Sequence, residues 1–335
     1  MIDLRSDTLT KPTPGMLKAM LEADAGDDVF EENTTVKELE NEVARIFGME
    51  AALFFPSGTM ANQTAIKAHT QPLDEVICDK LSHIYNYESG AWSMISGVSM
   101  RFTQSPYGIM NAAEIESLIL PDFDWYPNTR LVCVENTVNK GGGAVYPIDT
   151  LEEIARLCKR YNLLYHCDGA RIFNALVALN ESPERLHGLF DSISVCISKG
   201  LGAPAGSVLA GSKSFIKKCR KIRKALGGGM RQSGYLAAAC LYALHNHVER
   251  LKDDHHHAQL IASALQRCPL VKHVLPVQTN IIIFEVENAL DFVQKLTNFN
   301  ILVQPFSLTH VRMVTHLNIS SNDVEKVVGV IDSLQ

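Results

Sequence analysis

A lysine stands at the end of a strongly apolar segment near the middle of the chain. The segment VCISKGLGAP, residues 195–204, passes from valine, cysteine and isoleucine directly into Ser198 and Lys199. Lysine is seldom buried, because its ammonium group is costly to remove from water without a partner. Either the segment ends in water there, or Lys199 is present for the chemistry of its amine.

Two other segments end in groups suited to holding an anionic aromatic molecule. The segment PSGTM, residues 56–60, places small hydroxyl residues and a glycine before an expected helix, where free backbone N–H groups favour an anion such as phosphate. A plain helix N-cap has the same composition. The segment LLYHCDG, residues 163–169, ends in Asp168, which could equally cap a helix or pair with Lys199.

These groups together fit pyridoxal phosphate, which requires a phosphate cradle, a carboxylate for the pyridine nitrogen and a lysine for the Schiff base. The cradle would be formed by Ser57, Gly58 and Thr59. Asp168 would stabilise the protonated ring, and Lys199 would react as the neutral amine. Nucleotide motifs compete poorly, since residues 200–206 do not spell G-x-G-x-x-G and no Walker A sequence occurs.

The elements that must position these groups alternate along the chain. Apolar runs of strand length begin at residues 51, 75, 129, 163, 192 and 207, and amphipathic helical stretches begin at residues 36, 151 and 214. Such alternation predicts an α/β fold with a mostly parallel sheet covered on both faces. Ligands of such sheets bind at the carboxyl ends of the strands.

The pattern of strand-like and helical segments changes after about residue 245. A polar helix is followed by the strand-like runs TNIIIFEV, NILVQPF and HVRMVTHL. We therefore expect a large α/β cofactor domain over residues 1–245 and a smaller α+β domain over residues 246–335.

Composition excludes several classes of function. The chain has 335 residues and a net charge of -6, so we expect no nucleic-acid partner, and no apolar run is long enough for a membrane span. Its eight cysteines include no C-x-x-C pair, which suits a cytoplasmic protein without structural zinc. The triplet His255-His256-His257 is interpreted as a solvated helix face, because consecutive helical residues point in different directions. We expect no metal site.

The sequence resembles the low-specificity L-threonine aldolases, a family of fold type I pyridoxal phosphate-dependent enzymes, along nearly its whole length. The motifs that carry the resemblance are MIDLRSDTLTKPT at residue 1, GDDVF at 26, LFFPSGTMANQ at 53, SHIYNYESGA at 82, VENT at 134, HCDGARIFNA at 166, ISKGLGAPAGSVLAG at 197, KALGGGMRQSG at 224 and VRMVTHLNIS at 311. Their order and spacing match the family.

The resemblance implies roles for individual residues. Lys199 would carry the cofactor, Asp168 would pair with its ring nitrogen, and His83 would stack on the ring near the substrate hydroxyl. The substrate carboxylate would be bound by Ser6, Arg171 and Arg312, with Arg171 also bordering the cofactor. The cofactor region of a neighbouring subunit would be reached by Lys224 and Arg231, which implies a homo-oligomer, in the family usually a dimer of dimers.

The implied reaction is cleavage of L-threonine or L-allo-threonine to glycine and acetaldehyde. The chain departs from the family pattern at Trp125 and Val138, where histidines are usual, and at Phe30 and Glu31, where tyrosine and glycine are usual. Because an indole cannot accept a proton, the change at Trp125 leaves two alternatives open: β-elimination, or cleavage of a bulkier β-hydroxy amino acid. A cofactor-binding protein with little catalysis is the hypothesis from another class.

Overall fold

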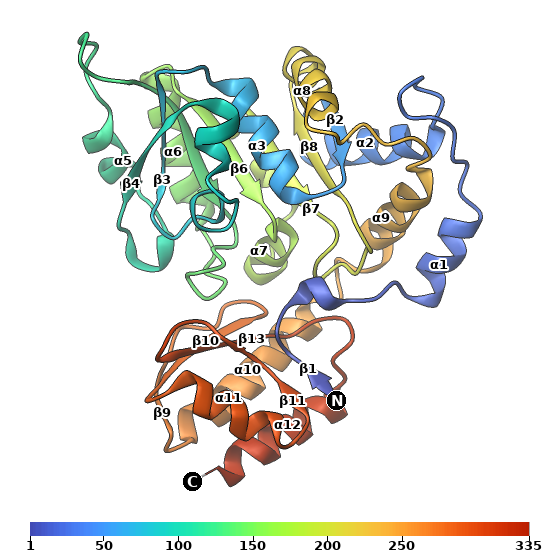
Figure 1. Cartoon of the computed structure of the whole chain (residues 1–335), viewed down its shortest axis with the longest axis vertical. Coiled ribbons are helices and arrows are strands. Elements are labelled where there is room, and N and C mark those ends of the chain that lie inside the picture. Colours follow the sequence, from blue (N-terminus) through green and yellow to red (C-terminus); the bar gives the residue numbers. More distant parts are fainter. Residues whose placement is uncertain (335) are drawn as a thin grey trace.

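Seven strands form the central sheet of the larger unit in the computed structural model, which describes residues 1–334. In chain order they are β2 (Ala51–Phe55), β3 (Asp74–Asp79), β4 (Ser99–Thr103), β5 (Asn128–Glu135), β6 (Leu164–Gly169), β7 (Ser192–Cys196) and β8 (Ser207–Gly211). Their spatial order is β2-β8-β7-β6-β5-β3-β4, and only β8 runs antiparallel to its neighbours (Figure 1). The predicted mostly parallel sheet is confirmed.

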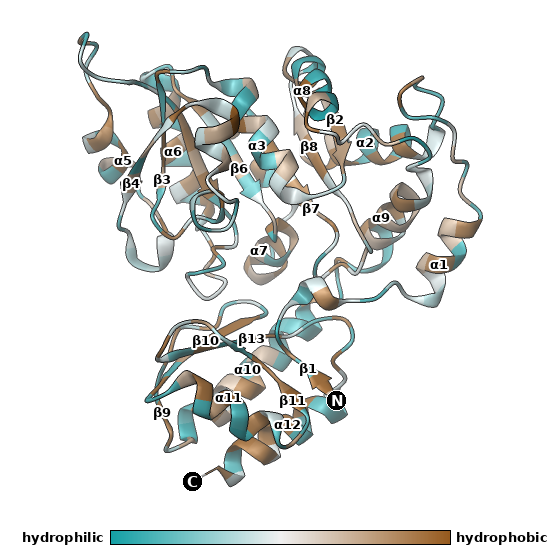
Figure 2. Ribbon diagram, in the orientation of Figure 1, coloured by the Kyte–Doolittle hydropathy of each residue, from teal (hydrophilic) through white to brown (hydrophobic). Residues whose placement is uncertain are grey.

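Helices cover both faces of this sheet. They are α1 (Pro14–Leu21), α2 (Thr34–Ile46), α3 (Gly58–His69), α4 (His83–Asn86), α5 (Ala112–Leu118), α6 (Ile148–Arg160), α7 (Ile172–Leu179), α8 (Lys213–Ala225) and α9 (Gly234–Asn246). Strand β2 is buried on both sides: Ala52 and Phe54 belong to the core that includes α2, whereas Leu53 and Phe55 pack with α3 and α8. The strands are accordingly hydrophobic, and the outer surface of α8 is hydrophilic (Figure 2).

Strand register aligns polar groups at the carboxyl end of the sheet. Glu135 on β5 lies beside Asp168 on β6, and Asp168 lies beside Ser194 on β7. Lys199 follows β7 by three residues, in the turn that leads to β8. This edge of the sheet therefore gathers the residues that the sequence selected.

The smaller unit is built on an antiparallel sheet of order β12-β13-β10-β9. Its strands are β9 (Val271–Val274), β10 (Ile281–Val286), β12 (Gln304–Pro305) and β13 (His310–Val314), and its helices are α10 (Leu251–Arg267), α11 (Ala289–Thr297) and α12 (Ser321–Ser333). The first strand of the chain, β1 (Ile2–Asp3), pairs with β11 (Ile301–Leu302) in this unit (Figure 1). The division near residue 245 stays a prediction, to which the structure adds that Ile2 and Leu4 join the C-terminal core.

Short helical turns complete the elements, at Asp7–Leu9, Trp92–Ser96, Pro106–Gly108 and Pro183–Leu186. Within residues 1–334 no helix has both the length and the apolar character needed to cross a membrane.

The histidine triplet is the clearest error of the sequence interpretation. His255 and His257 are buried, because α10 packs against both α7 and α12. His255 Nε2 lies 3.2 Å from Asn174 Nδ2, and His257 Nε2 lies 3.3 Å from Ser321 Oγ. Two of the three residues therefore connect helices, and the triplet is not a solvated face.

Candidate active site

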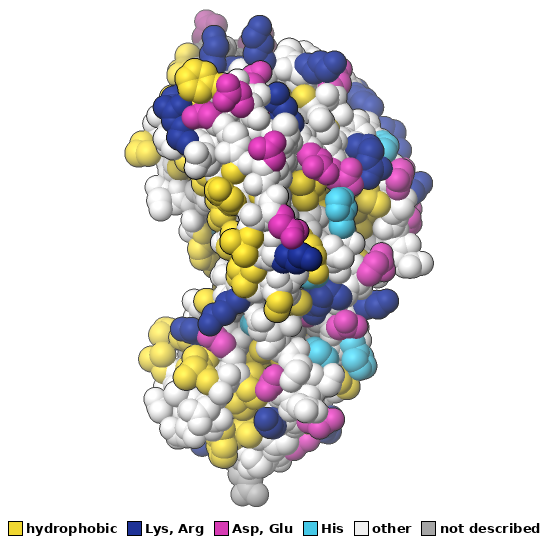
Figure 3. Space-filling view, turned by 90° about the vertical axis from the view of Figure 1, so that its right-hand side faces the viewer, with side chains coloured by type: hydrophobic (Ala, Val, Ile, Leu, Met, Phe, Trp, Pro, Cys, Tyr) yellow, Lys and Arg dark blue, Asp and Glu magenta, His cyan; other side chains and the backbone are white. Residues whose placement is uncertain are grey.

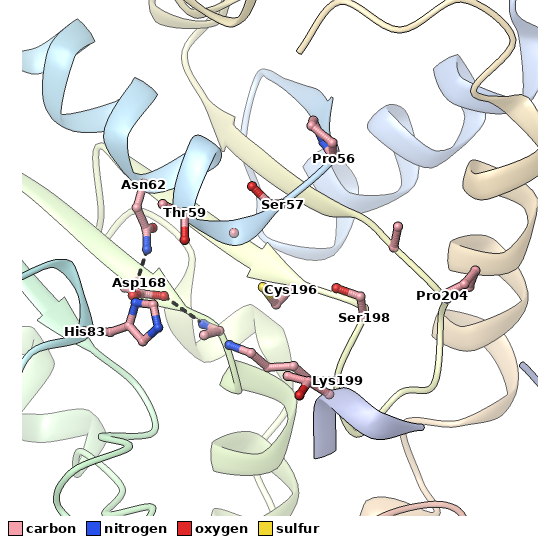
Figure 4. A pocket seen from close by; sticks show the side chains of 14 residues that line it. Pro56, Ser57, Thr59, Asn62, His83, Asp168, Cys196, Ser198, Lys199 and Pro204 are labelled. Atoms are coloured by element: carbon pink, nitrogen blue, oxygen red, sulfur yellow. Dashed lines mark hydrogen bonds between the residues drawn. The ribbon is translucent and has the colours of Figure 1, made fainter. Parts of the chain in front are cut away.

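A cavity of about 340 Å³ opens at the carboxyl ends of the strands. Among the residues that line it are six that the sequence selected: Ser57, Gly58, Thr59, His83, Asp168 and Lys199. The side chains of Lys199, His83 and Asp168 point toward one another from three different segments of the chain (Figure 4). Helix α3 begins on the opposite wall.

The start of α3 has the geometry of an anion cradle. Ser57 has an extended backbone and its Oγ accepts the N–H of Met60 at 3.2 Å, so the helix begins at Gly58. Helix geometry leaves the N–H groups of Gly58 and Thr59 without acceptors inside the helix. A Cβ atom at Gly58 would lie 2.6 Å from Cys196 Sγ, so no larger residue fits there without displacing the thiol. Glycine thus leaves the cradle open.

Asp168 is buried at the base of the cavity and held from two sides. Its Oδ2 accepts a hydrogen bond from Asn62 Nδ2 at 2.8 Å, and its Oδ1 accepts one from the backbone N–H of Ala170 at 3.1 Å. These two hydrogen bonds fix the orientation of the carboxylate, which lines the cavity. The group is therefore set to pair with a cation.

His83 is oriented by a buried carboxylate. Its Nδ1 lies 2.9 Å from Glu88 Oε1, and its backbone N–H donates to Glu135 Oε2 at 2.7 Å. Burial lowers the pKa of His83, but the hydrogen bond to Glu88 and the charges of Asp168 and Glu135 outweigh it and raise the pKa overall. Burial and the charge of Asp168 in turn raise the pKa of Glu135. With Nδ1 engaged by Glu88, Nε2 remains for a ligand.

A second cavity of about 400 Å³ adjoins the first, since both are lined by Thr8, His83 and Lys199. It also contains Ser6, Arg171 and Arg312, the three residues selected for a carboxylate. The residues that line it come from both units of the molecule.

Arg171 is anchored by Asp7. Its Nε and Nη2 donate to the two carboxylate oxygens at 2.7 Å each, and both side chains are nearly inaccessible to solvent. Burial alone would raise the pKa of Asp7, but the Arg171 charge lowers it to about 2. The third nitrogen of Arg171, Nη1, has no protein partner in residues 1–334, so part of the guanidinium is available to the second cavity.

Arg312 is less fully paired. Its Nη1 donates to Asn139 Oδ1 at 2.9 Å and its Nη2 to the carbonyl of Arg5 at 3.2 Å, whereas its buried Nε has no partner in the described part of the chain. Burial and the neighbouring charge of Arg171 lower the pKa of Arg312. An arginine remains charged nonetheless. Arg171 and Arg312 bring two positive charges to this cavity, and Asp7 compensates for one of them. The remaining positive charge therefore attracts an anion.

Three of the residues singled out in the sequence lie outside both cavities. Lys224 and Arg231 are exposed near the loop between α8 and α9, where Arg231 pairs with Asp27 at 3.2 Å. Trp125 is 72% exposed and stacks on Phe123 in the loop before β5. A single chain therefore does not bring these three to the site.

Sequence reasoning missed the residues that hold the site in place, chiefly Asn62, Glu88, Asp7 and Asn139. Asp7, Asn62 and Glu88 fall inside motifs that carry the family resemblance, and that position was the available signal. Their roles depend on contacts between segments far apart in sequence.

The sequence model of the family described as "Beta-eliminating lyase" matches residues 3–289. The chain belongs to this family. The resemblance found in the motifs is confirmed by two relatives of the chain. The low-specificity L-threonine aldolase 1 of Arabidopsis thaliana is 40% identical over 333 residues, which cover 96% of this chain and 93% of the plant protein. The low-specificity L-threonine aldolase of Escherichia coli K12 is 38% identical, with 98% and 97% covered.

Solved structures agree on the fold of this family member. A threonine aldolase from Leishmania major superposes with a TM-score of 0.86 at 20% identity, covering 99% of this chain and 98% of that chain. The predicted α/β fold class is confirmed.

Proposed function

We propose that this chain binds pyridoxal phosphate and cleaves L-threonine and L-allo-threonine to glycine and acetaldehyde. The observation that carries the proposal is the junction of the two cavities at Lys199. On one side lie an anion cradle and Asp168, and on the other lie two arginines. The names of the relatives from Arabidopsis thaliana and Escherichia coli support the same reaction.

The groups that line the first cavity fit the requirements of pyridoxal phosphate. Ser57, Gly58 and Thr59 would hold the phosphate at the start of α3, and Asp168 would hold the proton of the ring nitrogen. Lys199 is the lysine that lines this cavity and is the residue to which the cofactor would attach. When bound, the cofactor supplies an aldehyde that joins to an amine and a ring that accepts the electrons of a bond broken at Cα.

The second cavity would bind the carboxylate of the amino acid substrate. Arg171 offers the Nη1 group described above, Arg312 lines the same cavity, and Ser6 adds a hydroxyl. A carboxylate fixed by a planar guanidinium keeps one orientation, so the bond between Cα and Cβ is held toward the ring. The arginines would thereby select which bond breaks.

His83 is the group of this chain that can take the proton of the β-hydroxyl. Its Nδ1 is engaged by Glu88, and its side chain lines both cavities. Since Trp125 lies outside them, cleavage by this chain would depend on His83 or on water held by it.

A homo-oligomer is part of the proposal. Hydrophobic side chains gather in the middle of the face that carries α1 (Figure 3), and Leu17, Leu21 and Phe30 are at least half exposed. A second copy that packs on this face would cover these side chains. Lys224 and Arg231 of one copy would then approach the cofactor cavity of the other copy. We also propose a cytoplasmic location, because all eight cysteines are free thiols.

The test is acetaldehyde release from L-threonine by purified chain loaded with pyridoxal phosphate. We expect release by the wild type and a loss of at least about 1000-fold in Lys199→Ala, because the attachment point is removed. Lys252→Ala, at a lysine that is exposed on α10 and lies outside both cavities, is the comparison for loss of charge alone. A cofactor-loaded wild type that releases no acetaldehyde, but acts on bulkier β-hydroxy amino acids or forms pyruvate, would refute the threonine assignment.

A further inference from the structure

A line of hydrogen bonds leads away from Asp168 to the opposite end of α3. Asp168 Oδ2 accepts Asn62 Nδ2 at 2.8 Å, and Asn62 Oδ1 lies 3.3 Å from His166 Nε2. His166 Nδ1 lies 2.8 Å from Ser192 Oγ, which lies 2.7 Å from His69 Nε2. The line thus connects the cofactor cavity with His69, the last residue of α3.

The direction of every bond follows from Asn62. Its amide nitrogen contacts two carboxylates, Asp168 at 2.8 Å and Glu88 at 3.1 Å, so both of its hydrogens are donated and the amide cannot be flipped. Asn62 Oδ1 must then accept, from Ser194 Oγ at 2.6 Å and from His166 Nε2.

The remaining bonds are fixed in turn. A neutral His166 that donates from Nε2 accepts at Nδ1, so Ser192 donates its hydroxyl hydrogen to it. Ser192 Oγ then accepts from His69 Nε2. All donors along the line therefore point toward Asp168.

Both histidines are held neutral, as this pattern requires. Burial lowers the pKa of His166 to about 4, against the charge of Asp168, which raises it. Burial, together with His166, Lys218 and Arg130, lowers the pKa of His69 to about 3. The His69 ring also stacks on Phe215, with centroids 4.3 Å apart, at a surface cavity of about 300 Å³.

We propose that Asn62, His166, Ser192 and His69 form a relay of positioning residues that holds the Asp168 carboxylate, through the Asn62 hydrogen bond, in the orientation that pairs with the cofactor ring nitrogen. The inference rests on the proposed binding of pyridoxal phosphate. Aligned donors polarise one another, so each bond strengthens the next and the last one stabilises the carboxylate. None of the four was assigned a role by the sequence motifs, and His69 and Ser192 lie outside the cofactor cavity.

Asp168 has other titratable neighbours that any test must hold constant. They are Glu135 and Cys133 on β5, Cys167 and His166 on β6, His83 and Glu88 from the segment after β3, and Lys199 from the turn after β7. Substitutions at the far end of the relay leave all of them unchanged except through His166.

The test uses the full chain loaded with pyridoxal phosphate that is labelled with 15N in its ring. Ser192→Ala breaks the relay in its middle, and His69→Phe removes the end donor while keeping a ring that can stack on Phe215. Thr64→Val is the matched control, because Thr64 is a buried α3 residue whose hydroxyl has no partner in residues 1–334. The readouts are the ring 15N shift against pH and the cofactor dissociation constant, with thermal unfolding as a check of the fold.

In the wild type we expect a protonated ring nitrogen. In Ser192→Ala the pH at which it loses its proton falls by about 0.5–1 unit, and the dissociation constant rises about three- to tenfold, as for one lost hydrogen bond. His69→Phe shifts both the deprotonation pH and the dissociation constant in the same direction, by a smaller amount. Ser192→Thr keeps a hydroxyl, so its values lie closer to the wild type than those of Ser192→Ala. Thr64→Val titrates like the wild type.

The outcomes separate the two claims. A wild type that does not bind the cofactor overturns the proposed function. A wild type that binds it, with His69→Phe and Ser192→Ala titrating like Thr64→Val, overturns the relay alone. If Ser192→Ala does not fold, His69→Phe decides, because the His69 ring is only partly buried and borders a surface cavity.

Discussion

At the scale of single residues, the proposed reaction depends on His83, which would accept the proton of the β-hydroxyl, and on its partner Glu88. The two side chains lie 2.9 Å apart, and Glu88 is inaccessible to solvent, so its charge acts on the imidazole with little screening. The carboxylate fixes which ring nitrogen faces the ligand and raises the pKa of His83.

Glu88→Gln tests this pair. Without the negative charge the pKa of His83 falls, so the imidazole becomes neutral at lower pH. We expect the acidic limb of the pH profile of threonine cleavage to move to lower pH, together with the His83 resonance in an NMR titration. Glu88→Asp keeps the charge and is the comparison; an unchanged His83 titration in Glu88→Gln would show that Glu88 only fills space.

The sequence predicted residues whose chemistry is unusual for their position. Lys199 and Asp168 were visible because charged groups rarely end apolar segments. Asn62 and Glu88 were not, because Asn62 occupies an ordinary helical position and meets Glu88 only once α3 packs beside the segment after β3. Trp125 was correctly read as unable to accept a proton, but only the structure places it in an exposed loop.

At the scale of elements, the apolar strands were predictable, including the edge strand β2, and the polar edge strand β4 was not. All six predicted strands of the large unit are present, because each reads as a continuous apolar run. The missed strand β4, with the sequence SMRFT, lies at the edge of the sheet and carries Arg101, which pairs with Glu75 at 2.6 Å. A polar edge strand has no apolar run to reveal it.

Glu31 is a local conflict between sequence and backbone. Its φ is +59°, in the left-handed region that favours glycine, and glycine is the residue that the family pattern has there. The side chain is exposed, so its removal breaks no packing. We expect Glu31→Gly to raise the stability by up to about 1 kcal/mol, because the strain is relieved.

Thermal unfolding of Glu31→Gly beside Glu32→Gly checks this. Glu32 is an exposed neighbour without a positive φ, so glycine there only adds flexibility to the unfolded chain and lowers stability. Equal losses in both variants would contradict the strain at Glu31.

At the scale of the whole molecule, Asp7 joins the two units beside the second cavity. Its carboxylate accepts hydrogen bonds from Nε and Nη2 of Arg171 in the large unit. It also accepts one from Asn280 Nδ2, at 3.2 Å, in the small unit. One buried carboxylate thus connects the N-terminal segment, the start of α7 and the strand β10 region.

Asp7→Asn should destabilise the molecule by about 3–5 kcal/mol, because Arg171 stays buried without its counter-charge. In the wild type the folded pKa of Asp7, about 2, lies below the ordinary value of 3.8. Its contribution is therefore complete above pH 3.8 and is lost as the pH falls toward 2. Chemical unfolding of both proteins against pH measures this.

The matched control is Asp27→Asn, which breaks the exposed pair with Arg231. We expect a far smaller change there, because solvent screens that pair. If Asp7→Asn were as stable as Asp27→Asn, the buried pair would not be what holds the units together.

The central claim is that Lys199 carries the cofactor, and one measurement addresses it directly. The chain is loaded with pyridoxal phosphate, reduced with borohydride and digested. The masses of its peptides are then measured by mass spectrometry. We predict one phosphopyridoxyl group per chain, on the peptide that contains Lys199, and its loss in Lys199→Ala. Attachment chiefly to Lys224 or to other exposed lysines, or no stoichiometric attachment, would contradict the account.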